Sequence, residues 1–205
     1  MSDQPSIPDP MQDAAESARP SIVQHLDQTA AYPYSRWEYL RRSAWLLVQR
    51  LLVRPSPARA YAWRAFCLRR FGATIRGGVR PSVHIMHPWL LSLGQWSMLA
   101  DNVTVYNLGQ ITIGDHTVIS QDVYLCAGTH DYTLPNLPLQ RTPITIGSGV
   151  WIAAGAFIGP GVTIGDNSVV GARAVVVKDV PPGVVVAGNP ARVVKNRVMK
   201  SAPVS

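Results

Sequence analysis

From Ile146 onward the chain places an aliphatic residue at every sixth position. The rungs of this ladder are Ile146, Ile152, Ile158, Ile164, Val170 and Val176. A second column of small or β-branched side chains follows each rung by four residues, from Val150 to Val180. A period of six matches neither a helix nor a simple strand. It is typical of a parallel β-helix, in which the inward residues of one coil stack on those of the next.

The same register extends toward the N-terminus, with two interruptions. Further rungs at this spacing are Leu93, Leu99 and Val105, and then Ile113, Ile119 and Leu125. The step from Val105 to Ile113 is two residues too long, and the step from Leu125 to Ile146 is far longer. Residues 131–143 are therefore predicted to leave the coil as a loop. With three hexads to a coil, the pattern predicts a β-helix of about five coils over residues 73–188.

The residues on either side of the ladder differ from it in composition. Residues 1–33 are polar and proline-bearing, which predicts disorder. Residues 34–72 are predicted to be a helical extension. Residues 189–205 follow the last repeat and are predicted to be a tail.

Two helices are predicted within the extension. Apolar residues recur at helical spacing from Trp37 to Leu51, which predicts a helix from about residue 35 to 53. Ser56 and Pro57 predict the N-cap and first position of a second helix, which Gly72 would end.

The net charge of +7 is concentrated in residues 36–80, which contain many arginines and one acid, Glu38. Such a stretch suits nucleic acid, an anionic membrane face or an acidic substrate. Two interpretations of the helices stay open: they bind the cytoplasmic face of a membrane, or they cap the first coil, whose edge would otherwise be exposed.

Compartment and redox state can also be predicted. There is neither a signal-peptide pattern nor an apolar run near the roughly 20 residues of a spanning helix, which predicts a cytoplasmic protein. The two cysteines, Cys67 and Cys126, form no CxxC pair, so no disulfide framework or cysteine-rich metal site is expected.

His130 lies where the regular repeat ends and the predicted loop begins. An imidazole accepts a proton near neutral pH. In acyl transfer it would deprotonate an acceptor hydroxyl as that hydroxyl attacks a thioester. The alternative is a surface histidine at the start of a loop, and position alone leaves both open.

Several motifs resemble those of the hexapeptide-repeat acyltransferases, specifically the maltose, galactoside and nodulation acetyltransferases. They are YLCAGTHD at 124–131, PITIG at 143–147, PGVTIG at 160–165, KDVP at 178–181 and AGNPAR at 187–192. Toward the N-terminus, RPSP at 54–57, FGA at 71–73 and YN at 106–107 most closely resemble the colanic acid biosynthesis acetyltransferases. Those proteins are associated with exopolysaccharide O-acetylation.

The resemblance implies an all-β, left-handed parallel β-helix that assembles as a homotrimer with active sites between subunits. It implies acetyl-CoA as the acyl donor, a hydroxyl of a sugar or glycan intermediate as the acceptor, and no metal. It assigns His130 as the general base, with no covalent enzyme intermediate. No nucleic-acid partner is expected.

The resemblance also maps coenzyme contacts onto this chain. The pantetheine arm would pass the turns at Ala154 and Ala172, and Lys178, Arg192 and Lys195 would lie near the phosphates. The alternatives are that the alanines only fill turns and that the basic residues form a solvated tail. Val177 stands where the family often has a threonine, which removes one hydroxyl contact.

The acceptor side matches less well. Ala100 occupies a position where an asparagine is expected, and Asn107 and Asp131 are the candidate acceptor-binding or supporting residues. A free sugar, a nucleotide sugar, a lipid-linked glycan or a non-sugar hydroxyl of xenobiotic or serine type all remain open.

Two other classes share the predicted scaffold. The γ-type carbonic anhydrases hold zinc with histidines from successive coils, and no histidine follows His130 in this sequence. A non-catalytic scaffold would have no need of the His130 segment or of the AGNPAR motif.

Overall fold

The computed structural model describes residues 24–28 and 34–200. Most of the segment predicted to be disordered, residues 1–33, lies outside the described residues. The described residues fall into two compact units, one containing residues 24–28 and 131–138 and the other containing residues 34–130 and 139–200. In the first, η1 (Leu26–Gln28) is a single turn, and the His25 amide donates to the Pro135 carbonyl.

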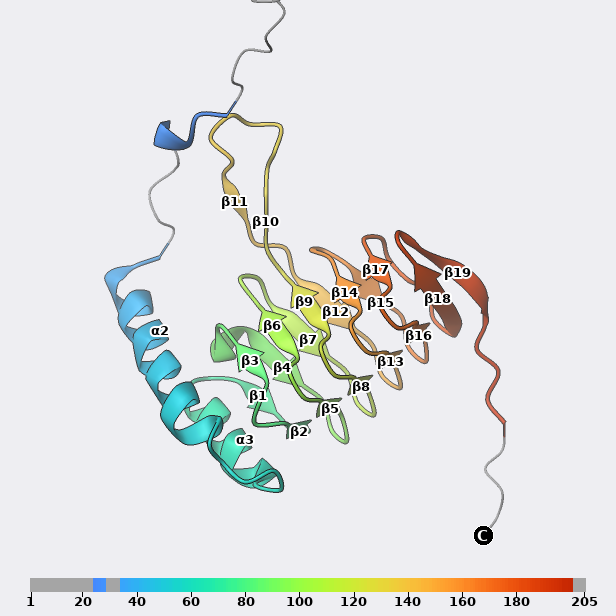
Figure 1. Cartoon of the computed structure of the whole chain (residues 1–205), viewed down its shortest axis with the longest axis horizontal. Helices are drawn as coiled ribbons and strands as arrows, with labels where there is room; N and C mark the ends of the chain where they lie inside the picture. The colour runs from blue at the N-terminus through green and yellow to red at the C-terminus, as the bar shows by residue number, and fades with distance from the viewer. Residues whose placement is uncertain (1–23, 29–33, 201–205) are drawn as a thin grey trace, which may run out of the picture. The chain divides into compact units, whose positions relative to one another are not determined.

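The second unit is a stack of parallel coils, each contributing a short strand to three sheets (Figure 1). Sheet A consists of β1 (Thr74–Ile75), β4 (Leu91–Leu93), β7 (Ile111–Ile113), β12 (Ile144–Ile146) and β15 (Thr163–Ile164). Sheet B consists of β2 (Gly78–Val79), β5 (Met98–Leu99), β8 (Val118–Ile119), β13 (Trp151–Ile152), β16 (Val169–Val170), β18 (Val184–Gly188) and β19 (Ala191–Asn196). Sheet C consists of β3 (His84–Ile85), β6 (Thr104–Tyr106), β9 (Tyr124–Cys126), β14 (Phe157–Ile158) and β17 (Val175–Val176).

The six-residue ladder is the core of this stack, as predicted. All six rungs from Ile146 to Val176 are at most 1% exposed, and the second column from Val150 to Val180 is at most 5% exposed. Ile146 pairs in register with Ile113 on one side and Ile164 on the other. Each coil therefore contributes a layer of aliphatic side chains, and burial of these layers holds the stack together.

Tight corners join the strands. Residues with positive φ recur every six positions at Gly149, Gly155, Gly161, Asn167 and Arg173. Glycine and asparagine occupy four of these five positions because they adopt this conformation at little cost. These positions mark the corners of the coil.

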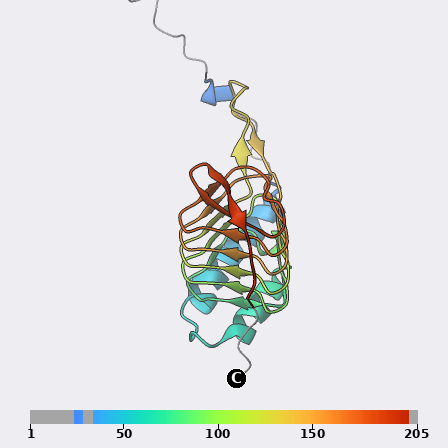
Figure 2. The ribbon, with the colours of Figure 1, turned by 90° about the vertical axis from the view of Figure 1, so that its right-hand side faces the viewer.

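The predicted loop begins as a two-stranded ribbon. β10 (Thr129–His130) pairs antiparallel with β11 (Leu139–Gln140), and sheet A resumes at Ile144. The C-terminal tail is also more ordered than predicted, because β19 folds back on β18 as an antiparallel strand. Figure 2 views the stack from this end, with β18 and β19 in front.

The first predicted helix is present as α2 (Arg36–Val48), which continues into a π-helical segment, η2 (Gln49–Val53). Ser35 caps α2 in a reciprocal bond with Glu38. The predicted start of the second helix is wrong. Ser56 donates its hydroxyl proton to the Val53 carbonyl, and α3 (Tyr61–Arg70) begins five residues later.

These helices cap the first coil, one of the two interpretations left open by the sequence. On sheet A, Arg69 Nε donates to Ile75 O, and on sheet B Arg64 Nε donates to Val79 O. On sheet C, Trp45 Nε1 donates to Ile85 O at 2.7 Å. Each of the three sheets thus has a carbonyl of its open edge satisfied by a side chain from a helix.

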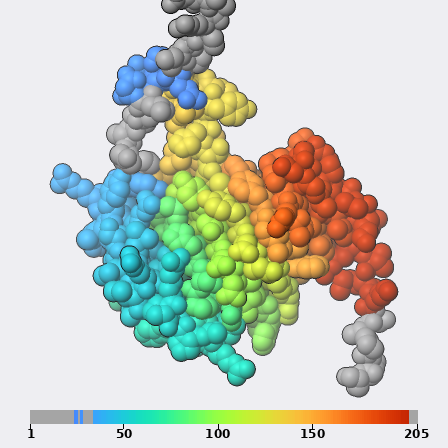
Figure 3. Space-filling model, in the orientation of Figure 1, coloured from blue at the N-terminus to red at the C-terminus, as the bar shows by residue number. Residues whose placement is uncertain are grey.

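The face of α2 that packs on the coil is not the apolar stripe predicted from the sequence. Trp45, Gln49 and Val53 are buried, whereas Trp37 and Leu51 are 72% and 57% exposed. The predicted stripe therefore lies on the outer surface of the cap, which forms one end of the unit in Figure 3. Among the described residues, no helix is long and apolar enough to cross a membrane.

Candidate active site

His130 stands at the end of the stem that leaves the stack between sheets C and A. Its partner in the β10–β11 ribbon is Leu139, and its side chain is exposed. Gly128 precedes the ribbon and packs closely on Leu108, since a Cβ there would lie 2.7 Å from Leu108 Cδ1. The histidine is thus held on paired backbone rather than on an irregular loop.

Asp131 follows His130 and begins the turn at the tip of the ribbon. Its Oδ1 accepts hydrogen bonds from the Thr133 amide, at 3.0 Å, and from the Thr133 hydroxyl. These bonds favour the carboxylate and lower the pKa of Asp131. Asp131 therefore carries negative charge beside His130 in the sequence, and its role toward His130 or an acceptor stays a prediction.

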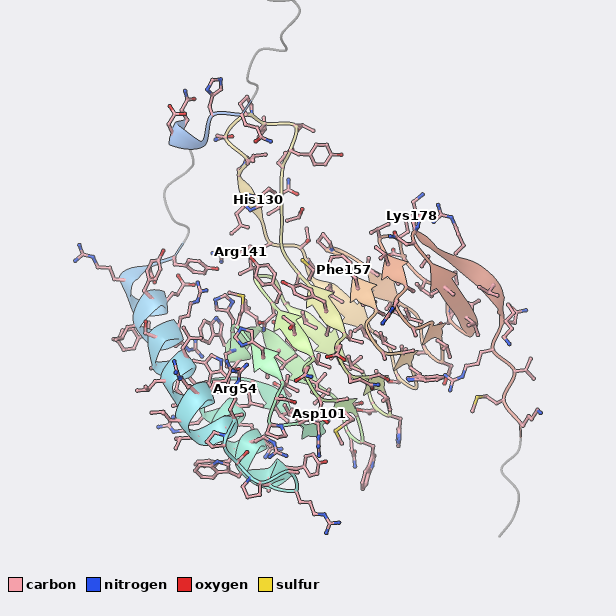
Figure 4. The ribbon with its side chains drawn as sticks, in the orientation of Figure 1. Arg54, Asp101, His130, Arg141, Phe157 and Lys178 are labelled. Carbon is pink, nitrogen blue, oxygen red and sulfur yellow. The ribbon has the colours of Figure 1, made fainter. Side chains whose placement is uncertain are left out.

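Lys178 and Arg192 meet at one pocket. The pocket has a volume of about 280 Å³ and is also lined by Asp179, whose Oδ1 accepts from the Thr163 amide at 2.8 Å. Lys178 follows β17, so it lies at the corner between sheets C and A, the corner from which the His130 stem departs two coils earlier (Figure 4). Lys195 pairs with Val185 on β18 and is not part of this lining.

Ala154 and Ala172 lie at a different corner, between sheets B and C. The two turns are bonded directly, since the Arg173 amide donates to Ala154 O at 2.9 Å. A strand of sheet C separates this corner from the corner that carries His130 and Lys178. Three strand residues span roughly 10 Å. Within one subunit, the alanine turns and His130 therefore occupy opposite ends of sheet C.

The structure corrects the expectation that Asn107 binds the acceptor. Asn107 is fully buried, and its side-chain amide bonds His87 in both directions. Its Oδ1 accepts from the His87 amide at 2.9 Å, and its Nδ2 donates to the His87 carbonyl. The residue links two adjacent coils where the chain carries its two-residue insertion, and no surface of it faces an acceptor.

Sheet C presents an outward aromatic column that sequence reasoning missed. Tyr124 and Phe157 pair in register and stack at 5.8 Å between ring centroids. Tyr106 continues the contact at 6.1 Å from Tyr124. Tyr124 and Phe157 each precede an inward rung by one position, and that alternation could have identified them.

The outward positions of the other sheets differ in chemistry. Sheet A shows hydroxyl side chains in register along its whole length: Thr74, Ser92, Thr112, Thr145 and Thr163. Sheet B exposes Val118 and Trp151. The three faces of the stack are therefore chemically distinct. In the described parts of the chain, no group of three or more histidine, cysteine or acidic residues is arranged to hold a metal ion.

Known proteins resemble this chain both in its repeats and over most of its length. Residues 143–178 match the family model described as bacterial transferase hexapeptide (six repeats). An Escherichia coli K12 protein named as a colanic acid biosynthesis acetyltransferase, WcaF, is 51% identical over 156 residues. That alignment covers 75% of this chain and 86% of the relative.

Solved structures agree with the coil architecture. A hexapeptide-repeat acetyltransferase of Vibrio cholerae, complexed with acetyl-CoA, superposes with a TM-score of 0.75 at 29% identity, covering 85% of this chain and 96% of the other. A galactoside acetyltransferase in complex with coenzyme A gives a TM-score of 0.71 at 31% identity, over 80% of this chain and 84% of the other.

Proposed function

This chain belongs to the hexapeptide-repeat acetyltransferases, and we propose that it moves the acetyl group of acetyl-CoA onto a hydroxyl of a sugar or glycan intermediate, with His130 as general base. The likeness to WcaF supports a role in exopolysaccharide biosynthesis. The observation that carries the residue assignment is positional. An exposed histidine on a paired stem shares one corner of the stack with the cationic pocket of Lys178 and Arg192.

The reaction needs one group that can accept and then return a proton. His130 takes the proton of the acceptor hydroxyl while the hydroxyl oxygen attacks the thioester carbonyl carbon. The tetrahedral intermediate collapses, the carbon–sulfur bond breaks, and the sulfur leaves with the proton returned by the imidazolium. The products are an acetyl ester and coenzyme A, and no bond to the enzyme forms.

The cationic pocket suits the polyphosphate end of the donor. Lys178 and Arg192 are both exposed and face the same cavity, so they can bind phosphate oxygens without desolvation of a buried charge. Lys195 lies on the same strand as Arg192, two pairs further along the β18–β19 ladder. We assign these three cations to the coenzyme phosphates and the turns at Ala154 and Ala172 to the pantetheine arm.

The separation of the alanine turns from the corner that carries His130 and Lys178 supports an active site shared between subunits of a homotrimer. If sheet C of each subunit faces the three-fold axis, the corner between sheets C and A of one subunit meets the corner between B and C of its neighbour. His130 and Lys178 of one subunit would then face Ala154 and Ala172 of another. The aromatic column on sheet C supports this arrangement, because it offers apolar area to bury at the axis.

Substitution of His130 tests the proposed base. We expect His130→Ala to bind acetyl-CoA as the wild type does but to lower kcat at least about 100-fold. A suitable control is His116→Asn, at an exposed corner with φ of 53°, where asparagine is tolerated. Release of free coenzyme A measures turnover, and calorimetry measures donor binding. Near wild-type turnover in His130→Ala would remove the mechanism.

The acceptor can be found with the same readout. Free sugars, nucleotide sugars, lipid-linked glycans and non-sugar hydroxyl compounds should be compared for acceptor-dependent release of coenzyme A. Peripheral contact with an anionic membrane through the helical extension would place the site near lipid-linked intermediates, and we therefore expect these to be the best acceptors. Activity on none of the carbohydrate acceptors would favour a non-sugar hydroxyl.

A further inference from the structure

The outer face of the helical cap carries an exposed apolar stripe beside arginines. Trp37, Leu40, Leu47 and Leu51 are 57–72% exposed, although each is large and apolar. The inner face is occupied by its bonds to the first coil, so this stripe has no partner among the described residues. A contiguous group of exposed apolar side chains on a protein surface marks an interaction site.

α3 extends the same kind of surface. Trp63 and Phe66 stack at 5.9 Å and are 44% and 58% exposed. Trp63 Nε1 donates to Leu52 O at 3.0 Å, which fixes α3 beside η2 and brings its aromatic pair next to the leucines. An exposed apolar ring whose N–H is already bonded can enter an apolar phase without leaving that donor unsatisfied.

A pocket with a cationic rim lies on the same helix. It has a volume of about 440 Å³ and is lined by Leu46, Gln49, Arg50, Arg54 and His84. Leu46, Arg50 and Arg54 recur at four-residue spacing along α2 and η2, next to the line of Leu47 and Leu51. Figure 4 labels Arg54 near the end of η2. The arginines therefore flank the apolar stripe on the side where the helix meets the stack.

The charge of this surface is one-sided. Between residues 36 and 80 the only acid is Glu38, and it is bonded to Ser35 at the start of α2. Burial and the neighbouring Arg54 and Arg42 lower the pKa of His84, which favours the neutral imidazole. An anion there would be attracted by Arg50 and Arg54, and no carboxylate lines the pocket among the described residues.

We propose that the outer face of α2, η2 and α3 docks on a membrane that contains anionic phospholipid. The leucine and tryptophan side chains enter the interfacial layer, and the pocket of Arg50, Arg54 and His84 takes one phosphate headgroup. The combination fits a lipid because the apolar stripe and the cationic pocket adjoin each other, as acyl chains and phosphate do. This docking proposal rests on the proposed function in one respect: an enzyme bound at the membrane would meet lipid-linked acceptors.

The same three-fold assembly would strengthen such docking. Three parallel stacks related by one axis present their helical caps at the same end, so three copies of the surface face one plane. Weak single contacts then combine, because the second and third bind at high effective concentration. We therefore expect vesicle binding to weaken in any variant that is monomeric.

Co-sedimentation of the full-length protein with vesicles tests the proposal. We expect binding to phosphatidylcholine vesicles containing phosphatidylglycerol at low salt, and little binding to phosphatidylcholine alone. Arg50→Glu with Arg54→Glu should lower the bound fraction at least about tenfold, given the usual contribution of each cation at an anionic surface. Leu47→Ser with Leu51→Ser should also lower it, with no change of net charge.

Controls separate the lipid from other occupants. Arg76→Glu with Lys200→Glu changes the net charge equally but lies outside α2, η2 and α3, and should retain binding to anionic vesicles. Excess inorganic phosphate at matched ionic strength should not displace the protein. Displacement by phosphate alone, absence of binding to anionic vesicles, or unchanged binding by the arginine variant would each overturn the proposal.

Two further measurements keep this test independent of the acetyl transfer. A change of sedimentation mass in the Leu47 and Leu51 variant would show that a second copy of the chain covers this face, and would also overturn the proposal. Release of coenzyme A with a water-soluble acceptor should be unchanged in the arginine variant. Failure of acetyl transfer in the wild type would refute the proposed function and leave the vesicle result intact.

Discussion

His87 is a buried histidine whose two ring nitrogens have unequal surroundings. Nδ1 lies 3.0 Å from the Asn107 carbonyl, which can only accept, so Nδ1 carries the proton. Nε2 has no hydrogen-bond partner in the described part of the chain. Protonation would place a second N–H in a site without an acceptor. Burial accordingly lowers the pKa of His87, with Arg42 and Arg141 adding to the effect and the Asn107 bond and Glu38 opposing it.

This pKa predicts a loss of stability on the acid side. The unfolded histidine has a pKa of about 6.5, and the folded value is lower, so below this pH the unfolded chain binds more protons. Stability from the neutral imidazole is complete above about pH 6.5 and falls as the pH drops toward the folded pKa. His87→Phe keeps a ring beside Trp89 and removes the titrating group.

We expect the variant to be less stable than the wild type at about pH 7.5 and the gap to narrow toward about pH 5. The midpoints of urea denaturation of both proteins across this pH range measure the difference in stability. His84, whose pKa is also lowered, remains in both proteins, so some acid sensitivity should persist in the variant. A gap that stays constant with pH would contradict the assignment.

At the level of single residues, the sequence predicted where a residue lies along the repeat better than which residues it contacts in space. His130 was identified because the repeat stops there. Asn107 was placed at the correct insertion, but its burial depends on His87, twenty residues away, and no local pattern reports that pairing. Arg64 belongs to the basic stretch of residues 36–80, yet it is fully buried and donates to Ser56, Pro57, Ala58 and Val79.

In some coils, a hydroxyl side chain of the second inward column hydrogen-bonds backbone groups of the neighbouring coil. Thr117 Oγ1 donates to Gly147 O at 2.7 Å and accepts from the Val150 amide at 3.1 Å. Ser168 repeats the device, donating to Pro181 O. Both residues are fully buried. These positions therefore need small side chains for packing and, in some coils, a hydroxyl oxygen that hydrogen-bonds neighbouring backbone groups.

Thr117→Val tests that requirement. Valine has the same shape but leaves the Gly147 carbonyl and the Val150 amide without this partner, so we expect a loss of about 2 kcal/mol or more in the free energy of unfolding. Thr112→Val, on the exposed side of sheet A, should change it by less than about 0.5 kcal/mol. Urea denaturation measures both. Equal midpoints for the two variants would refute the role of the hydroxyl.

The helices show why periodicity alone did not give the orientation of an element. α2 was predicted correctly in extent, but its apolar stripe faces outward. The inner face is partly polar because it must reach backbone groups of the first coil: Gln49 Oε1 accepts from the Ile85 amide at 2.9 Å. A helix face that hydrogen-bonds the edge of a sheet needs polar side chains. It therefore lacks the apolar pattern of a helix face that packs on a core. The strands had no such ambiguity, since all their inward residues meet other copies of the same repeat.

For the proposed trimer, the outward chemistry of the sheets bears on which of them lies at the three-fold axis. Sheet C offers the stacked Tyr124 and Phe157, whereas sheet A offers only hydroxyl side chains along its outward column. Burial of the aromatic column would release ordered water from a continuous apolar area, and burial of the hydroxyl column would not. Compared with sheet A, the outward chemistry therefore supports sheet C as the face at the proposed axis.

Phe157→Glu should dissociate the trimer, because a carboxylate at the axis would be repeated three times at close range. Thr145→Glu places the same charge on sheet A and should leave the trimer intact. Sedimentation velocity measures both masses. Activity should be lost with the trimer, since the alanine turns and His130 lie at opposite ends of sheet C within one subunit. A trimeric Phe157→Glu would move the axis to another face.

The antiparallel return of β19 has a consequence for solubility. A stack of parallel coils ends in open hydrogen-bonding edges, and a second molecule could extend it indefinitely into a fibre. Helix side chains bond all three sheets at the first coil. At the other end, β19 occupies the last edge of sheet B by pairing with β18 in the opposite direction. A parallel coil of a second molecule therefore cannot pair with β18, so extension of sheet B along the axis is blocked at this end.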